Sequence, residues 1–319
     1  MRSAMSALKS GVSPSASADI AVAAFVGGVS GLAQMSGNAL LLFPELGALS
    51  YGVFHRPNGP WATSPVLLVA TPFLAGVVGT LVTRNLPYGV LSVLIVVISA
   101  LLIIRLLRSP VAPAISAGLL PLTLGETGWW YAPSLVVGCG SLALISVIRR
   151  RLYPVSAGTE AAIHVEMPSG GAAGRDMSWV PFFTVFLVVA AACAIATGMR
   201  FLLFPPLVVI AYEMFSHSED CPWAQRPLLV PVICGLTATA TMLITGWLGA
   251  GPMAAALSAL CGATVLRIFR LRFPPAVAVA VLPFVMTQPD FRYPVAVTIG
   301  TVILCVAFFL WRSVRGRTG

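Results

Sequence analysis

The stretch "RLRFPPAVAVAVLPF", residues 270–284, decides the fold. Two prolines open an apolar run that a third proline closes, and Arg267, Arg270 and Arg272 stand at its entrance. The run from position 274 to position 286 is well short of the ~20 residues that a straight helix needs to cross a bilayer core ~30 Å thick. Proline is accommodated in the first turn of a helix and resisted in its interior. The stretch therefore predicts a short helix that begins at Pro274-Pro275 and kinks or stops at Pro283.

The composition predicts a helical membrane protein. The chain has 319 residues, of which 58% are hydrophobic and 9% are charged, whereas a soluble globular chain carries roughly 25% charged residues. The apolar runs have the length of helices and lack the alternation of an outer-membrane barrel. We expect an all-α, multi-pass protein of the cell (inner or plasma) membrane. The net charge of +9 does not indicate nucleic-acid binding, because the basic residues flank the apolar runs. No motif for a cofactor or a metal is found.

An internal duplication underlies the whole chain. "LLFPELGALSYGVFHRPNGPWA" begins at Leu41 and "LLFPPLVVIAYEMFSHSEDCPWA" begins at Leu202, an offset of 161 positions. One inserted residue in the following loop changes the offset to 162. The paired residues are then Tyr51 with Tyr212, Trp61 with Trp223, Arg108 with Arg270, Pro113 with Pro275, and Pro121 with Pro283. Such register in prolines, arginines and aromatics predicts two tandem repeats.

Each repeat is expected to contain six apolar segments, which makes about twelve in total. The expected segments are 19–36, 38–54, 66–83, 86–104, 110–124 and 129–147, then 179–197, 201–215, 227–248, 252–269, 274–287 and 293–311. The expected organisation is a cytoplasmic tail over 1–18, a first membrane repeat over 19–153, a cytoplasmic linker over 154–178, a second membrane repeat over 179–312 and a basic cytoplasmic tail over 313–319. Asp19 is a candidate N-cap of the first helix.

The distribution of basic residues predicts the orientation. If both termini are cytoplasmic and every segment crosses, all basic residues except Arg84, Arg200 and Arg292 lie on the cytoplasmic side. This is the positive-inside bias. An even number of crossings makes the two repeats parallel, related by an axis along the membrane normal.

The order of these parts resembles the HPP family of integral membrane proteins. The resemblance rests on "LLFPELGAL", a Pro-Trp loop, a Gly/Ala-rich helix, "RSPVAPAISAGLLPL" and "WWYAPSLVVGCGSLALISVIRRRLYP", and it covers about 20–153 and again 180–312. The family is named for a His-Pro-Pro motif, where this chain has Phe273-Pro274-Pro275 in the second copy and keeps only Pro113 in the first. Some members are associated with nitrite transport. The resemblance implies a transporter-like fold for a small anion.

The starts of the two short helices are candidate binding positions. A helix that begins inside the protein leaves backbone N–H groups without partners and carries a positive dipole end, and in transporters such ends face anionic substrates. Pro113 and Pro275 mark these starts, Ser116 follows in the first copy, and Arg108 and Arg270 lie just upstream. Alternatively, the prolines only shorten a helix and the arginines only fix the topology.

Further candidates lie in the second segment of each repeat. Glu45 and Glu213 are carboxylates within apolar runs, and an intramembrane ionisable group is a functional candidate by default. Neither is repeated, and Glu213 lies near the cytoplasmic end. A proton-coupled carrier would use such a carboxylate as its relay. Tyr51 and Tyr212 do recur and are either substrate-binding residues or interface anchors.

These observations favour a transporter or permease for a small solute, with an inorganic anion such as nitrite preferred, bound between two parallel repeats. The fusion of two copies predicts that a monomer suffices. The alternative is a non-transporting membrane scaffold or an accessory subunit of a membrane complex. An enzyme is not expected, because no polar catalytic cluster is found.

Overall fold

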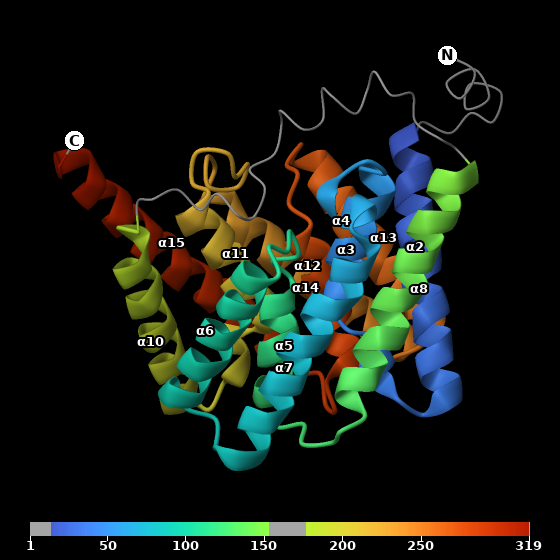
Figure 1. Ribbon diagram of the computed structural model, residues 1–319, viewed down its shortest axis with the longest axis horizontal. Coiled ribbons are helices and arrows are strands. Elements are labelled where there is room, and N and C mark those ends of the chain that lie inside the picture. Colours follow the sequence, from blue (N-terminus) through green and yellow to red (C-terminus); the bar gives the residue numbers. More distant parts are fainter. Residues whose placement is uncertain (1–13, 153–176, 319) are drawn as a thin grey trace.

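The computed structural model describes residues 14–152, the N-terminal half, and 177–318, the C-terminal half. The expected linker falls outside these residues except for Met177 and Ser178. All regular elements of the described residues are helices (Figure 1). The N-terminal half contains α2 (Pro14–Ser36), η1 (Ala39–Leu41), α3 (Glu45–His55), α4 (Pro60–Thr63), α5 (Pro65–Asn85), α6 (Val90–Leu106), α7 (Ala114–Leu124) and α8 (Tyr131–Leu152). The C-terminal half contains α10 (Trp179–Thr197), η2 (Arg200–Leu203), α11 (Pro205–Ser216), α12 (Leu229–Leu248), α13 (Pro252–Ile268), α14 (Pro275–Val281), η3 (Leu282–Val285) and α15 (Arg292–Thr318).

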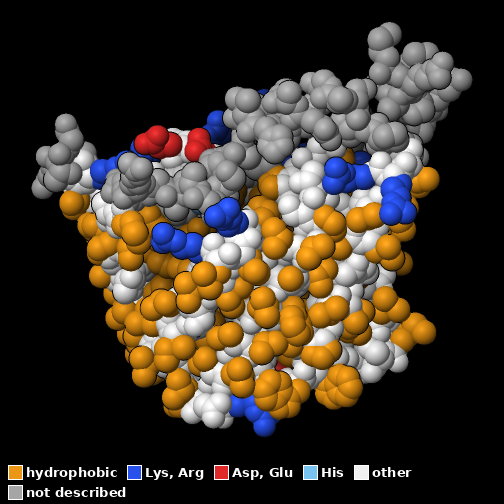
Figure 2. Space-filling model, viewed as in Figure 1, with side chains coloured by type: hydrophobic (Ala, Val, Ile, Leu, Met, Phe, Trp, Pro, Cys, Tyr) orange, Lys and Arg blue, Asp and Glu red, His pale blue; other side chains and the backbone are white. Residues whose placement is uncertain are grey.

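The outer surface is that of a membrane-embedded protein. Among the described residues, α2, α5, α8, α10, α12 and α15 are long and apolar enough to cross a membrane. Large apolar side chains such as Leu102 on α6 and Leu243 on α12 are more than half exposed, a state that lipid accommodates and water does not. Figure 2 shows hydrophobic side chains over the flank of the bundle, while Lys and Arg gather mainly at one end.

The two halves interlock through equivalent contacts. In the N-terminal half, α2 packs against α13 and α3 packs against α14 of the other half. In the C-terminal half, α10 packs against α6 and α11 packs against α7. Each of the helices α7 and α14 is therefore covered in part by a helix of the other half, α11 and α3 respectively. Neither half encloses its own short helix alone.

The two short helices, α7 and α14–η3, are enclosed by protein. Each covers eleven positions, 114–124 and 275–285, which corresponds to about 17 Å at 1.5 Å per residue. Every residue from 275 to 285 is buried, as is every residue from 114 to 123. Enclosure meets the requirement that backbone groups at membrane depth find partners in protein. The enclosure of α7 requires α5 to approach it closely at Gly79, where a Cβ atom would clash with the carbonyl oxygen of Gly118.

The prolines act largely as predicted, while the chain ends differ from expectation. Pro113 and Pro274 are the N-caps of α7 and α14. Pro283 lies where α14 changes into the 3-10 helix η3, whereas Pro121 lies inside α7. The expectation that Asp19 caps the first helix is wrong, because α2 already begins at Pro14 and Asp19 lies buried within it. At the other end, α15 continues through the expected basic tail to position 318.

Candidate functional site

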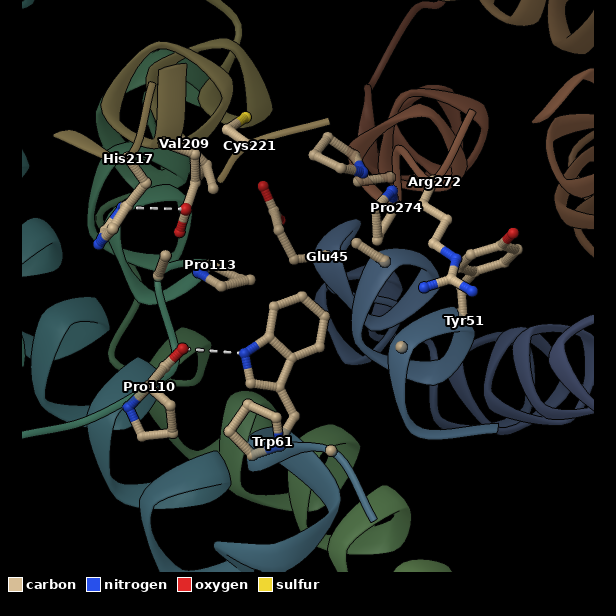
Figure 3. Close-up of a pocket in the computed structure, with 18 of the residues that line it drawn as sticks. Glu45, Tyr51, Trp61, Pro110, Pro113, Val209, His217, Cys221, Arg272 and Pro274 are labelled. Carbon is tan, nitrogen blue, oxygen red and sulfur yellow. Dashed lines mark hydrogen bonds and ion pairs between the residues drawn. The ribbon is translucent and has the colours of Figure 1, made fainter. Parts of the chain in front are cut away.

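A cavity of about 440 Å³ lies where the two halves meet (Figure 3). Residues from α3 and from the starts of α7 and α14 line it, together with α11 and the loops that follow α3, α6, α11 and α13. Of the candidates from the sequence, Glu45, Tyr51, Tyr212, Pro113 and Pro275 all line it, whereas Arg108, Arg270 and Ser116 do not.

Glu45 is the first residue of α3, and its side chain points into the cavity between Pro113 and Pro274 (Figure 3). The residue is only 2% exposed. Neither of its carboxylate oxygens has a hydrogen-bond partner among the described residues. On α7, the Ser116 hydroxyl faces Glu45 but is itself fully buried and without a hydrogen bond to a described residue. An ionisable group in such surroundings is costly to keep charged.

Aromatic and proline side chains form the cavity wall. Trp61 Nε1 of α4 donates a hydrogen bond of 2.9 Å to the carbonyl oxygen of Pro110. This bond joins α4 to the segment that precedes α7. Trp223 packs at 5.2 Å, between ring centroids, against Phe273. These contacts hold the loops in place around the proline-led starts.

The expectation of bare amide donors at the two short helices is wrong. At α7, the N–H groups of Ala114 and Ile115 donate to the carbonyls of Val111 and Ala112, at 3.1 and 3.0 Å. At α14, the N–H of Ala276 donates to the carbonyl of Phe273 at 3.1 Å, and Val277 donates to the carbonyl of Pro274 in the same way. Because tight turns before each helix satisfy these four N–H groups, none of the four is a free donor to the cavity.

Arg108 and Arg270 terminate the helices that precede them, α6 and α13. Both have positive φ, 49° and 50°, and both are exposed. At α13, Arg270 N–H donates to the carbonyl of Arg267 and Leu271 N–H donates to that of Leu266, both at 3.1 Å. This is the pair of hydrogen bonds of a Schellman C-cap, and the residues after α6 make the same pair.

Two arginines that sequence reasoning passed over, Arg272 and Arg56, line the cavity instead. Arg272 is exposed, and its side chain makes no hydrogen bond or ion pair with any residue in the described ranges. In Figure 3 its guanidinium lies beside Tyr51. The sequence offered no repeat signal for it, because Pro110 stands at the corresponding position of the N-terminal half. An unpaired guanidinium in a cavity is suited to binding an anion.

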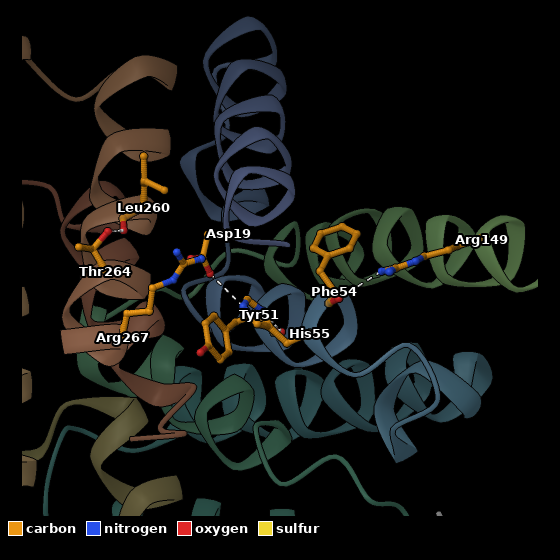
Figure 4. Close-up of polar contacts among 8 residues, drawn as sticks. All are labelled: Asp19, Tyr51, Phe54, His55, Arg149, Leu260, Thr264 and Arg267. Atoms are coloured by element: carbon orange, nitrogen blue, oxygen red, sulfur yellow. Dashed lines mark hydrogen bonds and ion pairs between the residues drawn. The ribbon is translucent and has the colours of Figure 1, made fainter. Parts of the chain in front are cut away.

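A polar cluster around the buried Asp19 stands behind one wall (Figure 4). Asp19 of α2 forms ion pairs with Arg267 of α13 and with His55 Nε2 of α3, the latter at 2.9 Å. His55 Nδ1 lies 3.0 Å from the carbonyl oxygen of Tyr51, and its ring stacks on that of Tyr51. Both ring nitrogens of His55 thus face hydrogen-bond acceptors. The cluster ties three helices together at the cavity edge.

On the opposite wall, Glu213 near the end of α11 pairs with His217 at 3.2 Å. The hydrogen bond with Glu213 raises the pKa of His217 above its ordinary value. Glu213 is thus held by a partner, whereas Glu45 is not.

No group of three or more His, Cys, Asp or Glu side chains suited to a metal ion occurs within the described ranges. Comparison of the chain with protein-family models, with curated proteins and with solved structures returns no match.

Proposed function

We propose that the protein is a membrane carrier for a small anionic solute, which binds in the cavity between the two halves. The observation that supports this most is that the Arg272 guanidinium lines a cavity of about 440 Å³ and makes no hydrogen bond or ion pair with a described residue. The cavity is bounded by short, protein-enclosed helices rather than by continuous spans, which is the arrangement of binding sites in secondary transporters.

The proposal includes a twofold repeat of six segments per half. Its support is that the contacts between the halves come in equivalent pairs, and that Arg108 and Arg270 share one unusual backbone conformation. Equivalent residues, such as Pro113 with Pro275 and Trp61 with Trp223, also line one cavity. We propose that both termini are cytoplasmic, that the cavity opens to that side and that all twelve segments cross, in keeping with the positive-inside bias.

We further propose that the chain consists of two fused copies of an HPP-like unit. In this arrangement α3 and α7 of one copy and α11 and α14 of the other share one site, so a single chain completes it. A monomer is then the functional unit.

The anion class follows from the cavity. Nitrite is the solute that the resemblance favours, but a cavity of about 440 Å³ falls in the range of small-molecule sites, roughly 300–1,000 Å³. The proline and aromatic wall suits a body larger than an inorganic ion. Small organic carboxylates therefore belong with nitrite among the solutes to be tested.

The test is uptake of labelled anions by proteoliposomes. The panel contains nitrite, nitrate, chloride, acetate and benzoate, with protein-free liposomes as background. We expect uptake of at least one anion, a loss of most of it in Arg272→Ala, and its retention in the matched control Arg270→Ala, which removes an arginine two positions away that does not line the cavity. If the folded wild-type protein moves none of these anions, the protein is better explained as a membrane scaffold or accessory subunit.

A further inference from the structure

We infer that Glu45 is a proton-binding site, and that one proton crosses the membrane on its carboxylate with each anion. This inference rests on the proposed carrier function. Its basis is geometric: Glu45 points into the cavity, is 2% exposed and has both oxygens without a hydrogen-bond partner among the described residues.

The charge state of Glu45 follows from its surroundings. A buried carboxylate that lacks both a counter-ion and hydrogen bonds costs several kcal/mol to keep ionised, and a membrane interior does not lower that cost. The Ser116 hydroxyl of α7 faces Glu45 and has no hydrogen-bond partner among the described residues. The form of Glu45 that fits this conformation carries its proton.

The neighbouring titratable groups do not supply a compensating charge at this depth. Tyr131 and Cys139 of α8 and Tyr293 of α15 interact electrostatically with Glu45, and all three are neutral in their protonated forms. No titratable side chain occurs in α14 or α4, which pack near α3. On α3 itself and on the other elements around it and the cavity, the ionisable groups are Asp19, Tyr51, His55, Arg56, Arg149, Tyr212, Glu213, His217, Asp220, Cys221, Arg267 and Arg272. Of these, the carboxylates of Asp19 and Glu213 already have partners.

Arg272 and Glu45 line the same cavity, and this links anion binding to the protonation of Glu45. An anion bound near Arg272 would be repelled by an ionised Glu45 in the same low-dielectric space, so the anion favours the protonated carboxyl group. In the anion-free return step, ionised Glu45 becomes the counter-charge of Arg272 within the cavity. Each transport cycle therefore moves one anion and one H⁺ in the same direction. The proton is taken up by the carboxylate on one side and released to water on the other, and a monovalent anion thus moves without net charge.

The test measures anion and proton movement together in proteoliposomes that contain a trapped pH indicator. Nitrate and chloride are the primary probes, because nitrous acid and carboxylic acids cross lipid bilayers unaided. With the interior more alkaline, we expect accumulation of the anion at equilibrium to rise about tenfold for each pH unit, as one-to-one coupling requires, with internal acidification that depends on the anion. An anion gradient without proton movement, or accumulation independent of the pH gradient, would overturn the inference.

Glu45→Gln provides the matched experiment, because glutamine resembles the protonated carboxyl group. We expect it to retain exchange of internal for external labelled anion while losing accumulation driven by the pH gradient. Glu219→Gln, in an exposed carboxylate that does not line the cavity, should keep gradient-driven accumulation. If Glu45→Gln still accumulates anions in response to the gradient, the inference is wrong. If Glu45→Gln does not fold, the proton-to-anion ratio measured for the wild-type protein still tests the inference. Absence of both uptake and exchange in the wild-type protein would instead refute the carrier function itself.

Discussion

The hydroxyl of Tyr293 donates a hydrogen bond of 2.7 Å to the carbonyl oxygen of Val279. Val279 lies four positions before Pro283, which has no N–H to donate to it, so the tyrosine supplies the donor that the helix lacks. The N-terminal half solves the same problem in the same way. There Tyr131 donates to the carbonyl of Ala117 at 2.7 Å, and Ala117 lies four positions before Pro121. Each half therefore repairs its broken short helix with the first turn of the following long helix.

Removal of this donor should be costly. We expect Tyr293→Phe to lower the free energy of unfolding by about 1–3 kcal/mol, the penalty of a buried acceptor left unpaired, as measured by thermal or denaturant unfolding in detergent. The double variant Tyr293→Phe with Pro283→Ala should recover most of this loss, because alanine returns the missing N–H.

Tyr88→Phe is the control for this cycle, since the Tyr88 hydroxyl makes no hydrogen bond with a described residue. It should leave stability nearly unchanged. Additive losses in the double variant would contradict the explanation.

Substitutions at Arg270 should separate helix termination from function. The residue adopts φ 50° at the end of α13, a conformation that costs an L-residue roughly 1–2 kcal/mol relative to glycine. We therefore expect Arg270→Gly to maintain or raise the melting temperature and Arg270→Ala to raise it less or lower it. A glycine variant as destabilised as the alanine variant would show that the guanidinium itself is needed.

The pairing of Asp19 with Arg267 and His55 should stabilise the junction of α2, α3 and α13. Asp19 is 4% exposed, so Asp19→Asn removes the charge from a buried acceptor, and we expect a loss of about 1.5–3 kcal/mol. Asp290→Asn is the matched control, because the Asp290–Arg292 pair is exposed and spans 3.9 Å, and exposed pairs contribute little. Equal losses in the two variants would mean that the cluster adds no stability of its own.

The His217–Glu213 pair should make stability depend on pH. The pKa of His217 is raised in the folded protein, so protonation favours the folded state. Its contribution is fully present below the unfolded value of about 6.5 and is lost as pH rises through the folded value. We expect His217→Asn to be less stable than the wild-type protein at pH 5.5, by roughly 0.5 kcal/mol, and equally stable at pH 9. A difference of the same size at both pH values would rule out protonation as its source.

The sequence predicts the helices well, because their limits are set by local chemistry. Pro113 and Pro274 cap the short helices as expected, and the apolar runs match the long ones. The recurrence of Pro113, Pro275, Tyr51 and Tyr212 also selects residues that line one cavity, because α3 packs against α14 and α11 packs against both α7 and α14.

Long-range partners could not be predicted in this way. Asp19 meets Arg267 only because α2 packs against α13 of the other half, and nothing local to either residue indicates that contact. Arg272 was noted at the entrance of the short helix but not chosen as a binding candidate, because Pro110 stands at the position 162 residues before it. Arg270 was chosen because it matches Arg108, and both residues terminate helices. The roles of Tyr131 and Tyr293 were within reach, since they recur at the same offset as Pro121 and Pro283, whose missing N–H groups their hydroxyls replace.

The proposed carrier requires one anion site between the two halves, and the number of anions bound per chain tests this most directly. Calorimetric titration of the detergent-solubilised monomer with nitrite, nitrate and acetate should reveal one site per chain. That site should be lost in Arg272→Ala and kept in Arg270→Ala. Two independent sites per chain, or an unchanged affinity in Arg272→Ala, would contradict it.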